Sequence, residues 1–299
     1  MNGLRVGRNE VYQSDYAVLK KYRSNFYKII LFKTIRRTGY EATDGDRHKK
    51  KQKTTAGNAS KLECNLSRAK SKIFELALCN DWQWFLTLTL DPVKFDRKNL
   101  NNYKTKLSTW IKNYNRLHKT NIKYLLIPEN HKDGSWHMHG LMMGLPIEHL
   151  HEFRADERLP IKMLIEIAHG HKLYNWPAYA KAFGYISISK IINAESVSRY
   201  ITKYITKDLV STRIGLNEHL YYCSQGLKRA ETIYQGKLTK DIKEDFSNEY
   251  VKIKTVRELE DAKAYFIAED EEAAQMGADD PIAITAPQGR TANNRQYRR

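Results

Sequence analysis

The chain has 299 residues, enough to bury one large core or two modest ones, and its 51 lysines and arginines outnumber 34 aspartates and glutamates to give a formal net charge of +17. Such an excess of positive charge favours a polyanionic partner, because each cation beside a phosphate displaces a condensed counterion. Three scattered cysteines argue against a disulfide framework or a thiolate zinc site, and no apolar run approaches the roughly 20 residues that span a bilayer, so we expect a protein of the reducing cytoplasm that does not bind membranes.

The N-terminal 58 residues are polar, basic and rich in tyrosine. Residues 47–53 (Arg-His-Lys-Lys-Lys-Gln-Lys) carry enough charge to stay solvated, whereas residues 27–33 have the apolar content of a short strand or a helical turn. We predict that residues 1–58 form a flexible basic arm whose charge suits a nucleic-acid backbone, and that ordered structure begins near Ser60.

Periodic apolar residues predict the next elements of the chain. Helical spacing runs from residue 62 to residue 79, and residues 84–90 (Trp-Phe-Leu-Thr-Leu-Thr-Leu) form a strand that ends before Pro92. Residues 97–118 return to helical spacing. Residues 124–129 and 136–143 are then predicted to be the two strands of a hairpin, with Asp133 and Gly134 at its turn.

The second half of the chain is less regular. Residues 145–182 are predicted to be an insertion over one edge of the sheet, residues 184–191 a strand, residues 194–209 a helix and residues 219–224 a closing strand. This order predicts an α+β fold, in which an antiparallel sheet of about five strands carries helices on one face and occupies residues 59–230. A C-terminal helical and strand extension over 231–276 and a disordered tail over 277–299 complete the prediction.

Two histidines of the hairpin form a candidate metal site. His137 and His139 alternate on one strand, so both imidazoles project from the same face of the sheet. Glu129 lies across the turn and would bring a carboxylate to the same place, with His131 as the alternative third ligand. A set of two histidines and one carboxylate leaves coordination positions open for water or substrate, as a catalytic metal requires. The alternative is an incidental pair on an exposed sheet face.

The predicted helix over 194–209 contains a short duplication, Tyr-Ile-Thr-Lys-Tyr-Ile-Thr-Lys, at residues 200–207. Because each helical residue advances by about 100°, Tyr200, Lys203, Tyr204 and Lys207 fall within an arc of about 100°. One helix face would therefore carry two phenols and two ammonium groups. By itself, this pattern is also typical of half-buried packing tyrosines beside lysines that extend to water.

Taken in order, three segments resemble the motifs of rolling-circle replication initiators, the His-hydrophobic-His (HUH) endonuclease superfamily. They are residues 85–89 (Phe-Leu-Thr-Leu-Thr), 136–142 (Trp-His-Met-His-Gly-Leu-Met) and 200–207. The paired tyrosines are most similar to the branch that contains the gene A proteins of icosahedral single-stranded-DNA phages and related replication-associated proteins. The resemblance covers about residues 60–230 and leaves the insertion at 145–182 without a role.

The resemblance implies an HUH, ferredoxin-like nuclease fold and a metal-dependent activity. The enzyme would nick and rejoin single-stranded DNA at the replication origin of a phage or plasmid, inside a bacterial host cell. His137, His139 and Glu129 would bind Mg²⁺ or Mn²⁺ at the scissile phosphate.

The resemblance also implies the nucleophiles. Tyr200 or Tyr204 would attack the phosphate and form a 5′-phosphotyrosine intermediate, while Lys203 and Lys207 would stabilise the developing charge. The free 3′-hydroxyl would prime synthesis, so a host helicase and a host polymerase are the expected partners.

Three other functions compete with this interpretation. A non-catalytic single-stranded-DNA-binding protein would use its tyrosines to stack on bases. A relaxase-like transfer nickase shares the chemistry, but relaxases usually carry an N-terminal nucleophile and a third histidine ligand, unlike the order found here. An iron oxygenase shares the two-histidine, one-carboxylate set, but neither paired tyrosines nor a charge of +17 serves its chemistry.

Overall fold

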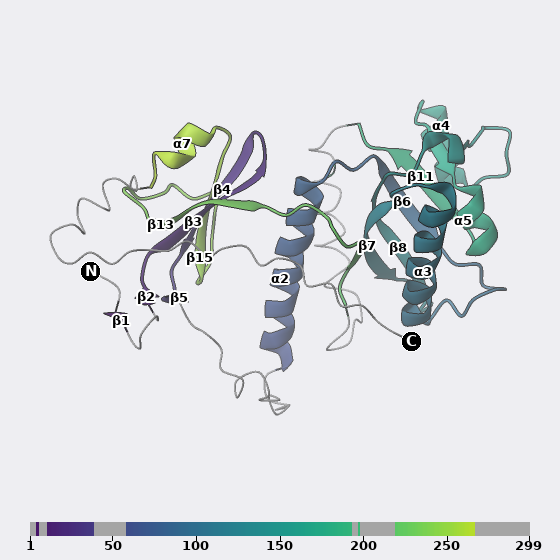
Figure 1. Ribbon diagram of the computed structural model, residues 1–299. Helices are drawn as coiled ribbons and strands as arrows, with labels where there is room; N and C mark the ends of the chain where they lie inside the picture. The colour runs from purple at the N-terminus through teal and green to yellow at the C-terminus, as the bar shows by residue number, and fades with distance from the viewer. Residues whose placement is uncertain (1–3, 6–10, 39–57, 193–196, 198–218, 267–299) are drawn as a thin grey trace, which may run out of the picture. The chain divides into compact units, whose positions relative to one another are not determined.

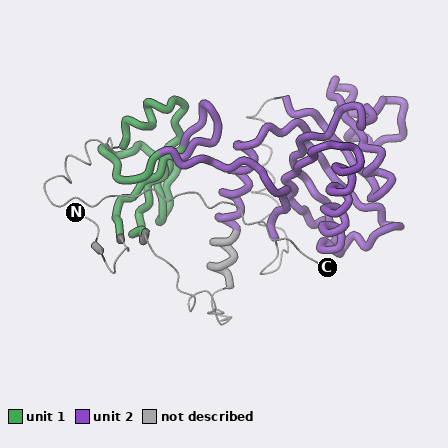
Figure 2. Tube along the Cα trace, viewed as in Figure 1, with its two compact units in different colours: residues 1–19, 28–39, 234–299 green, residues 20–27, 40–233 purple. Residues whose placement is uncertain are grey.

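The computed structural model describes residues 4–5, 11–38, 58–192, 197 and 219–266, and Figure 1 shows its helices and strands. The chain divides into two compact units (Figure 2). Unit 1 comprises residues 1–19, 28–39 and 234–299, and unit 2 comprises residues 20–27 and 40–233. Among the described residues, no helix combines the length and the apolar character needed to cross a bilayer.

Unit 2 is built on a seven-stranded sheet in the order β12-β7-β8-β6-β11-β10-β9, whose neighbouring strands are all antiparallel. Its strands are β6 (Trp84–Thr89), β7 (Lys123–Asn130), β8 (Trp136–Met143), β9 (His151–Glu152), β10 (Leu173–Asn175), β11 (Ile186–Lys190) and β12 (Tyr222–Cys223). The predicted α+β fold with an antiparallel sheet is therefore confirmed.

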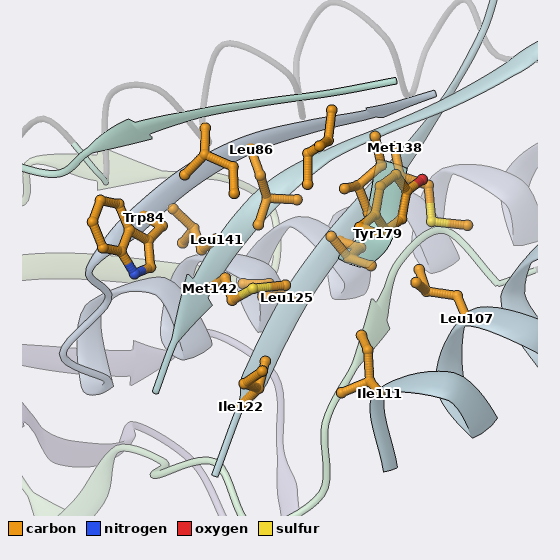
Figure 3. Packing of buried hydrophobic residues seen from close by; sticks show 14 of the residues in the cluster. Trp84, Leu86, Leu107, Ile111, Ile122, Leu125, Met138, Leu141, Met142 and Tyr179 are labelled. Atoms are coloured by element: carbon orange, nitrogen blue, oxygen red, sulfur yellow. The ribbon is translucent and has the colours of Figure 1, made fainter. Parts of the chain in front are cut away.

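One face of this sheet carries the main hydrophobic core. Strand β6 alternates strictly, with Trp84, Leu86 and Leu88 buried and the residues between them half-buried. Helices α3 (Leu100–His118) and α5 (Pro177–Ala182) contribute to the same buried cluster. Figure 3 shows Leu107 and Ile111 of α3 among these side chains. The opposite face of β6 is left with its polar residues.

Helix α2 (Asn58–Cys79) contacts β7, and its residues Ile73, Leu76 and Ala77 are buried in the same cluster. These buried positions lie three and four residues apart or adjacent, as one helical face requires. Asn80 ends the helix, and its side-chain amide donates to the carbonyl of Leu76 at 2.9 Å. The helix predicted up to residue 79 is therefore present.

The β7–β8 hairpin turns at Gly134, whose φ of +82° is a conformation that glycine adopts without strain. A second glycine lies inside β8. A Cβ atom on Gly140 would approach the carbonyl oxygen of Leu125 to 2.1 Å, so only glycine permits β7 to lie this close. The two glycines together hold the register in which Glu129 pairs with His137.

The segment 145–182 extends the sheet. It forms η1 (Ile147–His149), β9, α4 (Ile161–Ala168), β10 and α5. Strand β10 pairs with β11, and β9 pairs with β10, so the segment adds two strands at one edge. It also supplies Trp176 and Tyr179 to the core, where the hydroxyl groups of Tyr179 and Tyr103 lie 2.6 Å apart. The segment is thus an integral part of unit 2.

Unit 1 contains most of two further sheets, in the orders β1-β2-β5 and β13-β3-β4-β15-β14. Their elements are β1 (Leu4–Arg5), β2 (Val11–Gln13), β3 (Tyr16–Arg23), β4 (Phe26–Phe32), β5 (Arg36–Thr38), β13 (Glu231–Lys237), β14 (Phe246–Ser247) and β15 (Val251–Val256), with α7 (Leu259–Lys263) following them.

These strands correct the prediction of a flexible arm over residues 1–58. Residues 11–38 form strands, because Ala17, Leu19 and Ile29 are fully buried between the charged residues that dominate the composition. Their partners β13 and β15 come from the segment predicted as a C-terminal extension. The basic run at 47–53 and the tail at 277–299 lie outside the described residues.

Candidate functional site

The polar face of the unit 2 sheet brings together the residues of the predicted metal site. His137 and His139 lie on β8, and the register pairs His137 with Glu129 on β7. On the other side of β8, Thr89 pairs with His137 and Thr87 pairs with His139. Directly paired residues project from the same face, so three neighbouring strands present five polar side chains on the face opposite Leu86 and Leu88.

Each imidazole is held by a threonine. The Oγ1 atom of Thr89 lies 3.0 Å from Nδ1 of His137, and the Oγ1 atom of Thr87 lies 3.0 Å from Nδ1 of His139. Both rings therefore keep Nε2 for other contacts, an arrangement typical of histidines that bind a metal through Nε2. We expected these threonines only to shape the sheet floor or touch DNA. The signal was present in the sequence, because Thr-x-Thr and His-x-His have the same period on neighbouring strands.

Glu129 interacts directly with His139. Its Oε2 atom lies 2.6 Å from Nε2 of His139 and 4.0 Å from Nε2 of His131. The hydrogen bond to His139, helped by the nearby histidine charges and opposed by partial burial, lowers the pKa of Glu129. The ionised carboxylate only accepts, so His139 donates from Nε2 and its Nδ1 accepts from the hydroxyl of Thr87.

His137 has a different neighbour. Its Nε2 atom lies 3.3 Å from Nη2 of Arg97, which can only donate. Nε2 of His137 is therefore the acceptor, and Nδ1 donates to Thr89. Burial, followed by the charges of His131 and Arg97, lowers the pKa of His137 to about 4. At neutral pH this ring is thus uncharged, with the lone pair on Nε2 that a metal ligand needs.

Arg97 is a residue that the sequence analysis missed. Its Nη2 atom also donates to Oγ of Ser135 at 3.1 Å, and Ser135 donates to Asp133 at 2.6 Å. The Nε atom of Arg97 is buried and has no hydrogen-bond partner in the described part of the chain. The backbone carbonyl of Arg97 accepts from the amide of Trp136 at 2.9 Å, which anchors this arginine beside the start of β8. Nothing in the sequence distinguishes it from the other cations.

The donor types fit a divalent metal ion, since two imidazole nitrogens and a carboxylate oxygen lie on one face. Their positions show a direct hydrogen bond between Glu129 and His139. Within the described ranges, no three His, Cys, Asp or Glu side chains are arranged as a metal-binding group. His131 stays close, because its ring centroid lies 4.0 Å from that of His137. Metal binding therefore remains a prediction.

The predicted nucleophiles cannot be placed. Tyr200, Lys203, Tyr204 and Lys207 lie outside the described residues. Val197 is the one described residue of the segment 193–218, and it is buried. The proposed catalytic roles of the two tyrosines and two lysines remain predictions.

The other His-x-His pairs have separate partners. Nδ1 of His149 lies 2.9 Å from the hydroxyl of Tyr114, and Nε2 of His151 lies 3.1 Å from Glu157. His171 lies 3.7 Å from Glu166. These histidines thus pair with single groups elsewhere in unit 2.

Residues 83–209 match the model of a family described as replication-associated protein ORF2. The matched segment contains the threonine, histidine and tyrosine motifs, and the match supports a replication initiator that interacts with DNA. Neither the curated proteins nor the solved structures include a significant match to this chain.

Proposed function

We propose that this chain is an initiator of the HUH endonuclease type that nicks and rejoins single-stranded DNA at a replication origin, and thereby starts rolling-circle replication of a phage or plasmid. The observation that carries this proposal is the pair of histidines held by threonines beside Glu129, inside the segment that matches a replication-associated family. The paired tyrosines favour the two-tyrosine branch of the superfamily.

We assign His137, His139 and Glu129 as ligands of Mg²⁺ or Mn²⁺, which when bound supplies the positive charge that polarises the scissile phosphate. His137 already has the required tautomer, because Nδ1 donates to Thr89 and Nε2 accepts from Arg97. His139 must release the Nε2 proton that it now shares with Glu129. Its Nδ1 would then carry the proton and donate to Thr87, whose hydroxyl either donates or accepts.

We assign the nucleophile to Tyr200 or Tyr204. The phenolic oxygen forms a bond to phosphorus, the bond from phosphorus to the 3′-oxygen breaks, and the 3′-hydroxyl takes up a proton. Lys203 and Lys207 stabilise the phenolate and the developing charge. The phosphotyrosine keeps the energy of the phosphodiester, so the reverse attack by a 3′-hydroxyl rejoins the strand without ATP.

The duplication suits strand transfer. One tyrosine holds the first 5′ end while the other cleaves the regenerated origin. The free 3′-hydroxyl would be extended by a host polymerase, and a host helicase would open the duplex. These partners and a bacterial cytoplasmic location belong to the proposal.

The test is a covalent adduct. The protein is incubated with Mn²⁺ and single-stranded oligonucleotides from its own replicon, and adducts that resist denaturation are separated by electrophoresis. We expect an adduct that chelation abolishes and that the double variant Tyr200→Phe, Tyr204→Phe eliminates. Tyr185→Phe is the matched control, because Tyr185 is a 40% exposed tyrosine outside the motif. An adduct that persists in the double variant would refute the nucleophiles.

A non-catalytic single-stranded-DNA-binding protein is the second candidate. The direct hydrogen bond of 2.6 Å between Glu129 and His139 favours it, because the two groups satisfy each other without a metal. This candidate predicts binding that is sensitive to salt and no adduct with any metal. A relaxase-like transfer nickase predicts the same adduct on DNA from a transfer origin.

A further inference from the structure

A cavity of about 530 Å³ opens on the same polar sheet face as the two histidines. Its floor is formed by β6 and β11, and its wall by α4 and β10 of the segment 145–182. Thr87 belongs both to this floor and to the candidate site, because its Oγ1 atom contacts His139. The cavity therefore begins one side chain away from the residues assigned to the scissile phosphate.

The floor combines hydroxyl groups with an aromatic ring. Thr87 pairs with Ser187, and Phe85 pairs with Ser189, so all four side chains point away from the buried residues Leu86 and Ile188. The ring of Phe85 is half-buried. Apolar surface next to hydroxyl groups suits a base, which has a flat π face and polar edges. A volume of about 300–1,000 Å³ is usual for small-molecule sites, and this cavity falls within it.

The rim is positively charged. Lys162, Lys172 and Lys190 line the cavity, and all three are exposed. Lys172 pairs with Glu152 at 3.2 Å. In the part of the chain that the structure describes, Lys162 and Lys190 have no carboxylate partner. Glu166, the one acidic residue of the lining, lies 3.7 Å from His171. Two lysines are therefore left to neutralise anionic groups of a ligand.

We infer that this cavity binds one unpaired nucleotide of the DNA strand next to the phosphate that is cut. The base lies against the floor around Phe85 and Ser189, and the flanking phosphates contact Lys162 and Lys190. The inference rests on the proposed function, and it gives the segment 145–182 a role, because α4 and β10 supply the wall that makes a pocket from an open sheet face.

The test measures binding without cleavage. The full chain is titrated, with a chelator present, into a fluorescent oligothymidylate of about 20 nucleotides and into an abasic strand of the same length, and fluorescence anisotropy is followed. Ser189→Trp fills the floor and leaves every charge in place. We expect it to reduce the preference for thymidylate over the abasic strand by about fivefold or more, the effect of losing one stacked base. Asn113→Trp, an exposed position on α3 on the opposite sheet face, should leave the preference unchanged.

A second pair of variants tests the phosphates. Each phosphate contact on a single strand contributes about 0.7 to the slope of log K against log salt concentration, so Lys162→Gln with Lys190→Gln should reduce the slope by about 1.4. Lys112→Gln with Lys181→Gln removes the same charge at exposed positions outside the cavity and should change the slope less. Equal slopes in the two double variants, or an unchanged base preference in Ser189→Trp, would overturn the pocket.

The two proposals fail in different ways. A tyrosine-dependent adduct together with unchanged binding in the cavity variants would overturn the pocket and leave the nickase in place. A normal effect of the cavity variants with no adduct would support the pocket and overturn the nickase. If the unaltered protein does not bind the oligothymidylate, both are overturned.

Discussion

The two histidine halves of the candidate site have the same local support and opposite surroundings. Each imidazole meets a threonine at 3.0 Å through Nδ1. At Nε2, however, His137 faces the guanidinium of Arg97, whereas His139 faces the carboxylate of Glu129. The rings consequently hold their protons on different nitrogens. Repeated sequence produces equal scaffolds, while residues from other elements decide the protonation of each ring.

The largest expected effect comes from removing both rings. His137→Ala with His139→Ala should reduce adduct formation to background, because no imidazole remains to hold the metal. Most DNA binding that is sensitive to salt should remain, since it depends on the lysines and arginines. Gel electrophoresis of the adduct and anisotropy measure the two properties. His169→Ala alters an exposed histidine outside the site and is the control. Normal cleavage by the double variant would discard the metal site.

Glu129→Gln breaks the symmetry from the acidic side. The amide keeps the shape of the side chain, but it is a poorer metal ligand, and it lacks the charge that favours a cation. We expect Mn²⁺ affinity to fall more than in any single threonine variant, as measured by calorimetry. His131→Ala is the comparison, because His131 is the alternative third ligand. A larger loss in His131→Ala would reassign that ligand.

The threonines should contribute equally if they perform the same task in both halves. Thr87→Val and Thr89→Val remove one hydroxyl each with little change of volume, and each should lower Mn²⁺ affinity by about 10–100-fold, as loss of a group that orients a metal-binding histidine does. Thr→Ser at either position keeps a hydroxyl and should recover most of the affinity. Affinity that is unchanged in both valine variants would contradict the positioning role.

Arg97→Gln is the smallest and most selective change. Removing this positive charge stabilises the protonated ring, so the pKa of His137 should rise from about 4 toward the ordinary value of about 6.5. Burial, the larger cause, remains, so the rise should be partial. Nuclear magnetic resonance titration of the imidazole measures it. A pKa of His137 that stays unchanged would show that Arg97 does not interact with this ring.

Much of the candidate site was predictable because its pattern is local. The period of two places His137 and His139 on one face, and the turn at Gly134 brings Glu129 opposite them. The threonine contacts were predictable in principle from the same period. Arg97 was not, because it lies between β6 and α3 and reaches β8 only through the packing of the fold.

By itself, the sequence determined the α+β class, the hairpin, the core positions of β6 and the order of the three motifs, since each depends on periodicity or turn residues within a short stretch. Only the tertiary structure decided that β3 and β4 join β13 and β15, about 200 residues away in the chain, and that β9 and β10 extend the other sheet. Pairing between distant strands depends on which buried surfaces fit together, and no local pattern encodes that choice. The same reason separates the two histidines, which are alike in sequence and differ in their distant neighbours.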